Sequence, residues 1–255
     1  MTCSSTNSPL PEREPPFPRR ASSSLEVHLL GQVEFDAALF LQERLVYEVS
    51  GRNDICGTLL VCEHPPMITI GREGSRAHVL VEPRELTARQ MDVRWLNRGG
   101  GALVHAPGQL AVYPVLPLGR LGLGMSEYRR RLEQSVISVA RELRVAAWST
   151  PDQPGARCRL GQFAHVGAAV KSWVSYHGMF INVSPASEFL RMTKPGPGDV
   201  RVTSLAAQRQ AVTPMAQVRE SVVRNLAERL GYPKYHVYTG HPLLRRTLRR
   251  VYVPA

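Results

Sequence analysis

The segment from Arg98 to Gln109 combines residue types that often handle a ligand. Three consecutive glycines, Gly99 to Gly101, would let a ligand approach the backbone and its N–H groups. Arg98 beside them can bind a carboxylate, a phosphate or a carbonyl, and His105 follows one short strand later. A glycine run alone favours a plain hairpin between two strands without a ligand. The wider set of motifs described below favours the ligand-binding loop.

Other reactive side chains in the sequence give weaker indications of a catalytic site. Cys158 stands between Arg157 and Arg159, whose charges could lower a thiol pKa, although a cysteine without a role fits the same pattern. His105 and His177 could act as bases, or could simply pack against their neighbours. The chain has four cysteines in no zinc-like spacing, so we predict no metal site and no cofactor.

Length and composition indicate one large domain. The 255 residues are 43% hydrophobic and 21% charged, which is ordinary for a globular protein. No apolar run reaches the length of a membrane span. Residues 1–24 are rich in proline, serine and arginine and lack a signal-peptide core, so we expect a disordered tail. We therefore expect a protein with reduced thiols in the cytoplasm, working as a monomer.

The net charge of +11 indicates which partners the protein could bind and says little about its fold. Arginines dominate it, with clusters at 129–131 and 245–250. A solvated arginine face explains this charge, and an acidic protein partner would also fit. Nucleic acid is disfavoured, because no base-stacking aromatic set and no known binding motif accompany the basic clusters.

The pattern of apolar residues predicts the elements that would position these side chains. Apolar residues at three- and four-residue steps predict helices over 33–49, 126–143 and 214–230, the second capped by Ser126. Short β-rich runs predict strands at 25–30, 58–62, 67–70, 93–96, 109–116, 163–173 and 179–183, with the last two joined near Tyr176-His177-Gly178. This irregular mixture indicates an α/β or α+β fold with a mixed sheet and few helices.

Several short motifs then fall in a fixed order. They are Glu63-His64-Pro65-Pro66, Gly71-Arg72, Arg98-Gly99-Gly100, His105-Ala106-Pro107-Gly108-Gln109, Tyr113-Pro114, Tyr176-His177-Gly178, Asn182 and Val202-Thr203-Ser204-Leu205. In this order the chain resembles the octanoyltransferases of lipoate synthesis, whose pattern runs EHPP…GR, RGG…HGPGQ…YP, GxKIAxxG, FHG…N, PCG and VTSL. The resemblance covers roughly residues 25–235, between the tail and a basic C-terminal extension at 236–255.

The resemblance implies a biotin/lipoate protein ligase-like fold, in which a mixed sheet flanked by helices encloses an acyl tunnel. Members of the family transfer an octanoyl group from acyl carrier protein to a lysine of a lipoyl domain, through a cysteine thioester. The lipoyl domains belong to 2-oxoacid dehydrogenases or to the glycine cleavage H protein. Acyl carrier protein and the lipoyl domains are both acidic. The substrate-binding positions implied here are Arg98, Gly99, Gly100, Gly101, Ala102, Leu103, Val104, His105, His165, Val166, Gly167, Gly178, Met179 and Phe180.

The sequence departs from the family pattern at the two positions that carry the family's catalytic residues. The family's lysine corresponds to Gln162, and its cysteine corresponds to Gly196, or to Pro195 when counted back from Val202. Neither glycine nor proline can form a thioester, and a neutral amide does not stabilise a thiolate. Cys158 and Lys171 are the nearest substitutes, but an odd spacing from Gln162 places Lys171 on the opposite face of a strand.

Three functions follow from this pattern. The chain could be an acyltransferase that uses another nucleophile or direct transfer from the bound thioester. It could be a non-catalytic binder that keeps the acyl pocket or the carrier-protein surface. It could also be a lipoate-ligase-like enzyme, although ligases use a lysine where this chain has Gln162. We favour the non-catalytic binder.

Overall fold

The computed structural model describes residues 23–196 and 200–244. The expected tail therefore lies almost wholly outside the described residues, as does the arginine cluster beyond residue 244. Within the described ranges, no helix has the length and apolar character needed to cross a membrane.

An eight-stranded mixed sheet forms the centre of the molecule, in the order β11-β1-β2-β6-β10-β9-β8-β7. Strands β11, β1 and β2 run parallel to one another, and the remaining neighbours are antiparallel. The strands are β1 (Leu25–Gln32), β2 (Gly57–Glu63), β6 (Gln109–Val115), β7 (Trp148–Thr150), β8 (Gln153–Cys158), β9 (Gly161–Lys171), β10 (Val174–Asn182) and β11 (Tyr235–Thr239).

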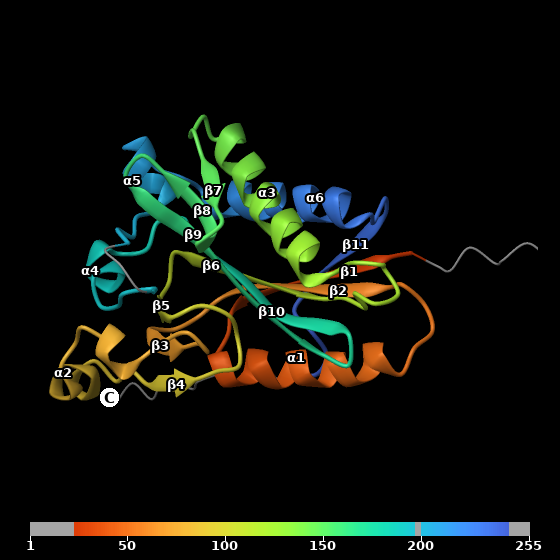
Figure 1. Cartoon of the computed structure of the whole chain (residues 1–255), viewed down its shortest axis with the longest axis horizontal. Helices are drawn as coiled ribbons and strands as arrows, with labels where there is room; N and C mark the ends of the chain where they lie inside the picture. Colours follow the sequence, from red (N-terminus) through yellow and green to blue (C-terminus); the bar gives the residue numbers. More distant parts are fainter. Residues whose placement is uncertain (1–22, 197–199, 245–255) are drawn as a thin grey trace, which may run out of the picture.

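A smaller sheet, in the order β4-β3-β5, lies beside helix α1 on one side of the large sheet (Figure 1). Its strands are β3 (Met67–Ile70), β4 (Val93–Trp95) and β5 (Ala102–His105). The strand expected before His105 is thus present, but β5 pairs with β3 and not with β6. The segment 98–109 therefore connects two sheets and is not a simple hairpin.

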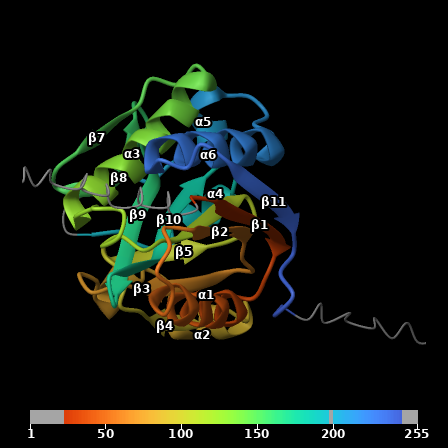
Figure 2. The ribbon, with the colours of Figure 1, turned by 90° about the vertical axis from the view of Figure 1, so that its right-hand side faces the viewer.

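Helices cover both faces of the large sheet. Helices α3 (Met125–Glu142) and α6 (Met215–Leu230) cover one face, and α1 (Phe35–Ser50) covers the other (Figures 1 and 2). The short helices are α2 (Pro83–Ala88), α4 (Ser187–Leu190) and α5 (Leu205–Arg209), with a 3-10 turn at Arg76–His78. A mixed α/β fold with helices flanking a mixed sheet, as expected, is confirmed.

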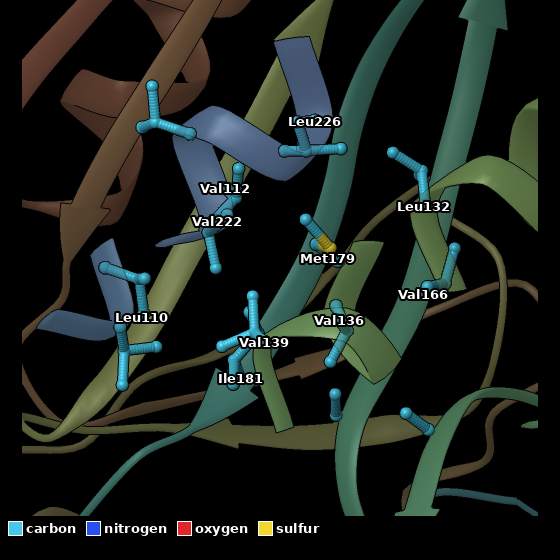
Figure 3. Close-up of a cluster of buried hydrophobic side chains, with 14 of the residues drawn as sticks. Leu110, Val112, Leu132, Val136, Val139, Val166, Met179, Ile181, Val222 and Leu226 are labelled. Carbon is cyan, nitrogen blue, oxygen red and sulfur yellow. The ribbon is translucent and has the colours of Figure 1, made fainter. Parts of the chain in front are cut away.

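The main core lies between the large sheet and the helices α3 and α6. Figure 3 shows how side chains of β6, β9 and β10 meet those of the two helices there. Because successive side chains of a strand alternate between faces, each strand contributes every second residue to this core. The intervening residues pack on the α1 side. The buried apolar residues labelled in the figure are Leu110, Val112, Leu132, Val136, Val139, Val166, Met179, Ile181, Val222 and Leu226.

Three details of the expected elements need correction or extension. Helix α3 begins after Gly124, and Ser126 does not cap it. Strands β9 and β10 are joined at Ser172-Trp173, which have φ of 52° and 57°, and not near Tyr176–Gly178. Two consecutive positive φ values are typical of a two-residue type I′ hairpin, for which Ser-Trp is an unusual sequence. Finally, β11 extends the large sheet beyond residue 235.

Candidate functional site

Arg98 is completely buried and holds its own loop together. Its Nη2 donates to the Thr69 carbonyl at 2.8 Å and to the Gly101 carbonyl at 2.9 Å, and its Nη1 donates to the Gly99 carbonyl at 3.0 Å. The Thr69 hydroxyl accepts a further bond from Nε at 3.2 Å. Burial lowers the pKa of the guanidinium to about 9. The Nε, Nη1 and Nη2 atoms of Arg98 thus all donate within the protein, and binding of a ligand anion by Arg98 stays a prediction.

The N–H groups of the three glycines are also occupied. Gly99 donates to the Ala168 carbonyl at 3.3 Å and Gly101 to the Pro195 carbonyl at 3.0 Å. Gly100 donates to the Glu73 carboxylate at 3.2 Å. The loop is therefore anchored to β9 and to the 195 segment, and it presents no row of free donors.

His105 belongs to a continuous chain of hydrogen bonds. The Thr69 hydroxyl, which accepts from Arg98, donates to His105 Nε2 at 2.8 Å, and His105 Nδ1 donates to the Gln109 side-chain oxygen at 2.8 Å. Gln109 donates to Asn182 at 2.9 Å, and Asn182 donates to the Thr203 carbonyl at 3.1 Å. With both ring nitrogens engaged, His105 has no free lone pair to act as a base.

The remaining motif residues extend this network. The Tyr113 hydroxyl bonds to His64 Nε2 at 2.7 Å, and His64 Nδ1 bonds to the Val33 carbonyl at 2.8 Å. The Glu63 carboxylate accepts from the Gly108 N–H at 2.8 Å. Much of the shared motif pattern thus serves to fix the backbone around one small region.

A small cavity of about 20 Å³ lies beside this network, with room for about one water molecule. Two of the positions singled out from the sequence line it: Gln162 and Pro195. Gln162 donates its side-chain N–H to the Pro154 carbonyl at 3.0 Å. The full lining is Leu103, Gln109, Gln162, Ala164, His165, Phe180, Asn182, Pro195 and Val202.

The geometry distinguishes the two alternative positions for the family's cysteine. A Cβ added at Gly196 would meet no atom of the described residues within 4 Å, whereas Pro195 lies in the cavity wall. Pro195 therefore lies in the same cavity wall as Gln162, and Gly196 does not. Which of the two corresponds to the family's cysteine stays a prediction.

None of the cysteines that the structure describes reaches the cavity. Cys158 is 2% exposed, lies in the main apolar core and donates weakly to the Gly161 carbonyl at 3.5 Å. Burial raises the pKa of the Cys62 thiol, which lies 3.6 Å from His64 Nε2. Cys56 contacts Ser24 at the far end of β2, and Cys3 lies outside the described residues. Lys171, exposed at the end of β9, is equally remote.

The expected substrate-binding residues separate into two groups. Leu103, His165 and Phe180 line the cavity, and Gly99, Gly100 and Gly167 pack beside it. Val166 and Met179 point to the opposite face of the sheet, into the core under α3 and α6 (Figure 3). Ala102 and Val104 are buried in the core of the small sheet. These four side chains therefore do not line the cavity, because alternate residues of a strand face opposite ways.

A wider cleft of about 410 Å³ opens on the other side of the glycine loop. His177 lines it, and burial lowers the pKa of this imidazole to about 3. Its backbone N–H donates to the Gln42 side chain at 2.7 Å, and its Nδ1 has no partner among the described residues. Gln42 is a polar residue on the buried face of α1, and its side chain fixes the backbone of His177.

Comparison with known proteins agrees with this geometry. The family described as "Lipoyl protein ligase A/B catalytic domain" matches residues 35–227. The chain belongs to this family. An octanoyltransferase of Geotalea uraniireducens is 37% identical over 194 residues, which cover 76% of this chain and 87% of the relative. An octanoyltransferase of Geobacter metallireducens is 41% identical over 194 residues with the same coverage.

Solved structures of lipoate protein ligases share the fold. The bi-partite lipoate protein ligase from Thermoplasma acidophilum, described together with its E2 lipoyl domain, has a TM-score of 0.67 at 14% identity. The alignment covers 87% of this chain and 89% of that ligase. Lipoate-protein ligase A bound with ATP has a TM-score of 0.65 at 15% identity. The alignment covers 86% of this chain and 90% of that protein. The resemblance to the octanoyltransferases inferred from the motifs is confirmed.

Proposed function

We propose that this member of the lipoyl ligase and octanoyltransferase family binds an acidic carrier domain of lipoate metabolism without forming an acyl thioester on itself. The observation that carries the proposal is the cavity between Gln162 and Pro195, which contains no thiol and has a volume of about 20 Å³. The carrier would be acyl carrier protein or a lipoyl domain, by analogy with the octanoyltransferase relatives and with the ligase described with its E2 lipoyl domain.

Thioester chemistry needs a nucleophile that is partly ionised near neutral pH. Proline has no such group, and the buried thiols of Cys62 and Cys158 lie elsewhere in the fold. The amide of Gln162 carries no charge that could stabilise a thiolate or activate an acid. This argues against both the usual transfer and the ligase-like reaction.

A basic groove supports carrier binding. Two adjoining hollows, of about 510 and 370 Å³, share Arg144, Val145, Ala146 and Trp148. We call them together the arginine groove; its further cations are Arg141, Arg159 and Arg209. Within the described ranges, no acidic side chain lines it and none of its arginines forms an ion pair. Unpaired guanidinium groups around the exposed Trp148 suit an acidic protein surface.

The groove also lies near the cavity along the chain. Arg159 lies in the turn between β8 and β9, three residues before Gln162 in the sequence. Leu160 between them is held to α5 through its N–H, which donates to the Gln208 side chain at 3.1 Å. A carrier domain docked on the groove would therefore hold its acyl or lipoyl arm near the site.

Direct transfer of an octanoyl group between two carrier domains is the competing function, and the octanoyltransferase relatives favour it. The purified protein should therefore be incubated with octanoyl-acyl carrier protein and an apo lipoyl domain, while the intact masses of all three are followed. We expect no octanoyl adduct on this chain and no transfer above a protein-free control. Octanoylation of the lipoyl domain above that control would refute the proposal.

Binding needs its own measurement. We expect the double variant Arg144→Glu, Arg159→Glu to lose at least tenfold in affinity for acyl carrier protein in calorimetric titration. Arg84→Glu, a charge reversal on exposed α2, should change it less than twofold. Equal affinities in both variants would show that the arginine groove is not the docking surface. Action in the cytoplasm and as a monomer stays a prediction, to be tested by fractionation and light scattering.

A further inference from the structure

Two neighbouring residues of β10, Tyr176 and His177, line the same open cleft of about 410 Å³. Adjacent residues of a strand normally face opposite sides of the sheet. Phe180 packs on the α1 side and Met179 on the other, so regular alternation would place His177 on the side of Met179. His177 instead has a φ of 53°, and the centroid of its ring lies 4.7 Å from that of Tyr176. The turned backbone therefore brings a second side chain to the cleft.

Helix α1 holds this turned backbone in place. Gln42 is fully buried, and its side-chain oxygen accepts a hydrogen bond from the His177 N–H at 2.7 Å. Burial lowers the pKa of His177 to about 3, so the ring is neutral at physiological pH, and its buried Nδ1 has no partner among the described residues. A positive φ and an unpaired buried nitrogen both cost stability, so fold stability alone does not account for this arrangement.

The cleft also carries one charge of each sign. Arg72 and Glu43 line it, and within the described ranges neither forms an ion pair. Arg72 donates through Nη1 to the Asn97 carbonyl at 2.8 Å, and its Nε and Nη2 have no partner among the described residues. Burial raises the pKa of Tyr176, while Arg72 acts to lower it and Glu43 to raise it further, so both charges lie near this phenol. A ligand with a carboxylate and an ammonium would pair both charges.

The remaining side chains of the cleft suit an apolar group. Leu39 of α1, Leu96 and Trp95 line it, and Trp95 is 62% exposed. A volume of about 410 Å³ lies within the range of small-molecule sites. A linear aliphatic acid would contact the apolar wall but would leave Glu43 without a partner.

We propose that this cleft binds a free α-amino acid with an apolar side chain. Arg72 binds the carboxylate, Glu43 binds the ammonium, and the apolar side chain packs against Trp95. Gln42 is a positioning residue, because it acts through the backbone of His177, whose imidazole is a further acceptor for the ammonium. The site goes beyond the proposed function and does not depend on it, since the cleft and the arginine groove share no lining residue.

Isothermal titration calorimetry of the whole protein with L-leucine tests the inference. Isocaproate, which is leucine without the amino group, and isoamylamine, which lacks the carboxylate, are the matched probes. Because each probe loses one charge-assisted contact, we expect both to bind at least about fivefold more weakly than leucine. The inference is overturned where leucine does not bind, or where isocaproate or octanoate binds as tightly as leucine.

Glu43→Gln tests the ammonium contact, since it removes the charge and keeps the size of the side chain. The affinity for leucine should fall at least about fivefold, while the affinity for isocaproate should not fall. Glu48→Gln makes the same change on the same helix, outside the cleft, and should leave the affinity for leucine unchanged. Equal losses of leucine affinity in the two variants would contradict the site.

The positioning role of Gln42 needs its own pair of variants. Gln42→Met removes the acceptor of the His177 N–H and should lower the affinity for leucine at least about threefold. Gln42→Glu keeps an acceptor oxygen and should bind leucine as the wild type does. Where circular dichroism shows that Gln42→Met does not fold, His177→Phe, which removes the imidazole nitrogens, takes its place. Wild-type affinity for leucine in the folded variant would refute the positioning role.

Discussion

The two faces of the eight-stranded sheet are packed in different ways. On the α3 and α6 side, strand residues such as Val112 and Ile181 meet apolar helix residues in one large core (Figure 3). On the other side, the sheet packs against α1 and the small sheet and buries Arg98, His64 and His105 together with His165 and His177. Of the buried side-chain nitrogens without a partner in the described ranges, those of His78, His165 and His177 belong to this second side.

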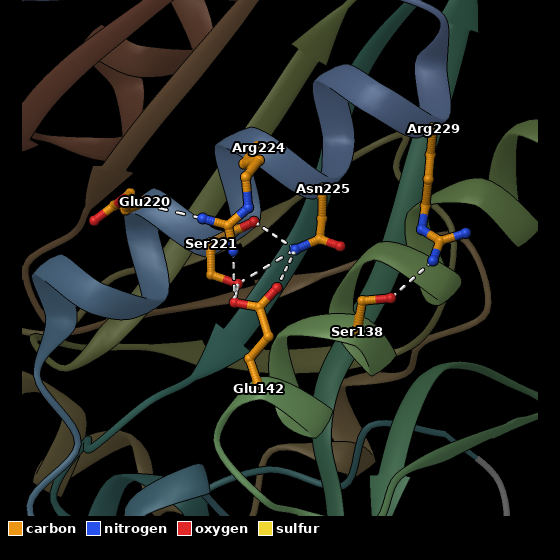
Figure 4. Close-up of polar contacts among 7 residues, drawn as sticks. All are labelled: Ser138, Glu142, Glu220, Ser221, Arg224, Asn225 and Arg229. Atoms are coloured by element: carbon orange, nitrogen blue, oxygen red, sulfur yellow. Dashed lines mark hydrogen bonds and ion pairs between the residues drawn. The ribbon is translucent and has the colours of Figure 1, made fainter.

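Polar side chains of α3 and α6 are mostly paired with one another. Figure 4 shows Glu142 of α3 accepting bonds from Ser221 at 2.6 Å, Arg224 at 2.7 Å and Asn225 at 2.9 Å, all on α6. Arg229, whose Nε has no partner, still donates through Nη2 to Ser138 at 2.8 Å. Apolar burial explains one face of the sheet, whereas the other keeps unpaired polar groups that stability alone would not select. The second face is therefore where function is expected.

Acid should distinguish the faces most strongly. Burial lowers the pKa of His64 to about 4 and those of His165 and His177 to about 3, against about 6.5 in an unfolded chain. Between pH 6.5 and 4 the unfolded chain binds more protons, so the free energy of unfolding falls as pH falls. Each histidine contributes up to about 1.4 kcal/mol per pH unit. Urea unfolding at pH 7.5, 6 and 5 measures this. In His165→Leu the free energy of unfolding should fall less steeply with pH, by the contribution of one histidine.

Truncation of the apolar face should cost about 3 kcal/mol. Leu226 on α6 is fully buried in the main core, and Leu226→Ala removes its apolar contacts and leaves a cavity. Urea denaturation should show the loss with an unchanged m-value. Leu80→Ala, at a position 52% exposed, is the control and should change stability by less than about 0.5 kcal/mol. Similar losses in the two variants would contradict this account of the core.

Removal of the rim carboxylate should cost less. Partial burial acts to raise the pKa of Glu142, but hydrogen bonds from Ser221, Asn225 and Arg224 outweigh it and lower the pKa overall. We expect Glu142→Ala to lower the free energy of unfolding by about 1 kcal/mol, because the carboxylate is partly solvated. Thermal melting at low and high salt measures the effect, which should shrink with salt.

Replacement of a buried histidine on the α1 side of the sheet should change the free energy of unfolding least. His165→Leu should leave stability at neutral pH unchanged or raise it by about 1 kcal/mol, since a buried nitrogen without a partner is replaced by an apolar group of similar size. A core histidine that contributed to stability would instead cost several kcal/mol on replacement. Chemical denaturation at pH 7.5 distinguishes the two outcomes.

The sequence by itself determined the helices, most strands and the family. Apolar residues recur at helical spacing in α1, α3 and α6 because each helix buries one face, and this spacing is visible in the chain. The ordered motifs identified the family because several weak patterns in register are jointly specific. The absence of cysteine at residues 195 and 196 is equally a fact of the sequence.

Only the tertiary structure decided how the motif residues are used. Hydrogen bonds join residues far apart in the chain, such as Arg98 with Thr69 and Asn182 with Thr203, so no local pattern could show that Arg98 is already satisfied. The pleat of β9 and β10 turned Val166 and Met179 away from the site while directing His165 into it. Such placements depend on packing between segments that meet only in the folded chain, which is why the sequence pattern did not reveal them.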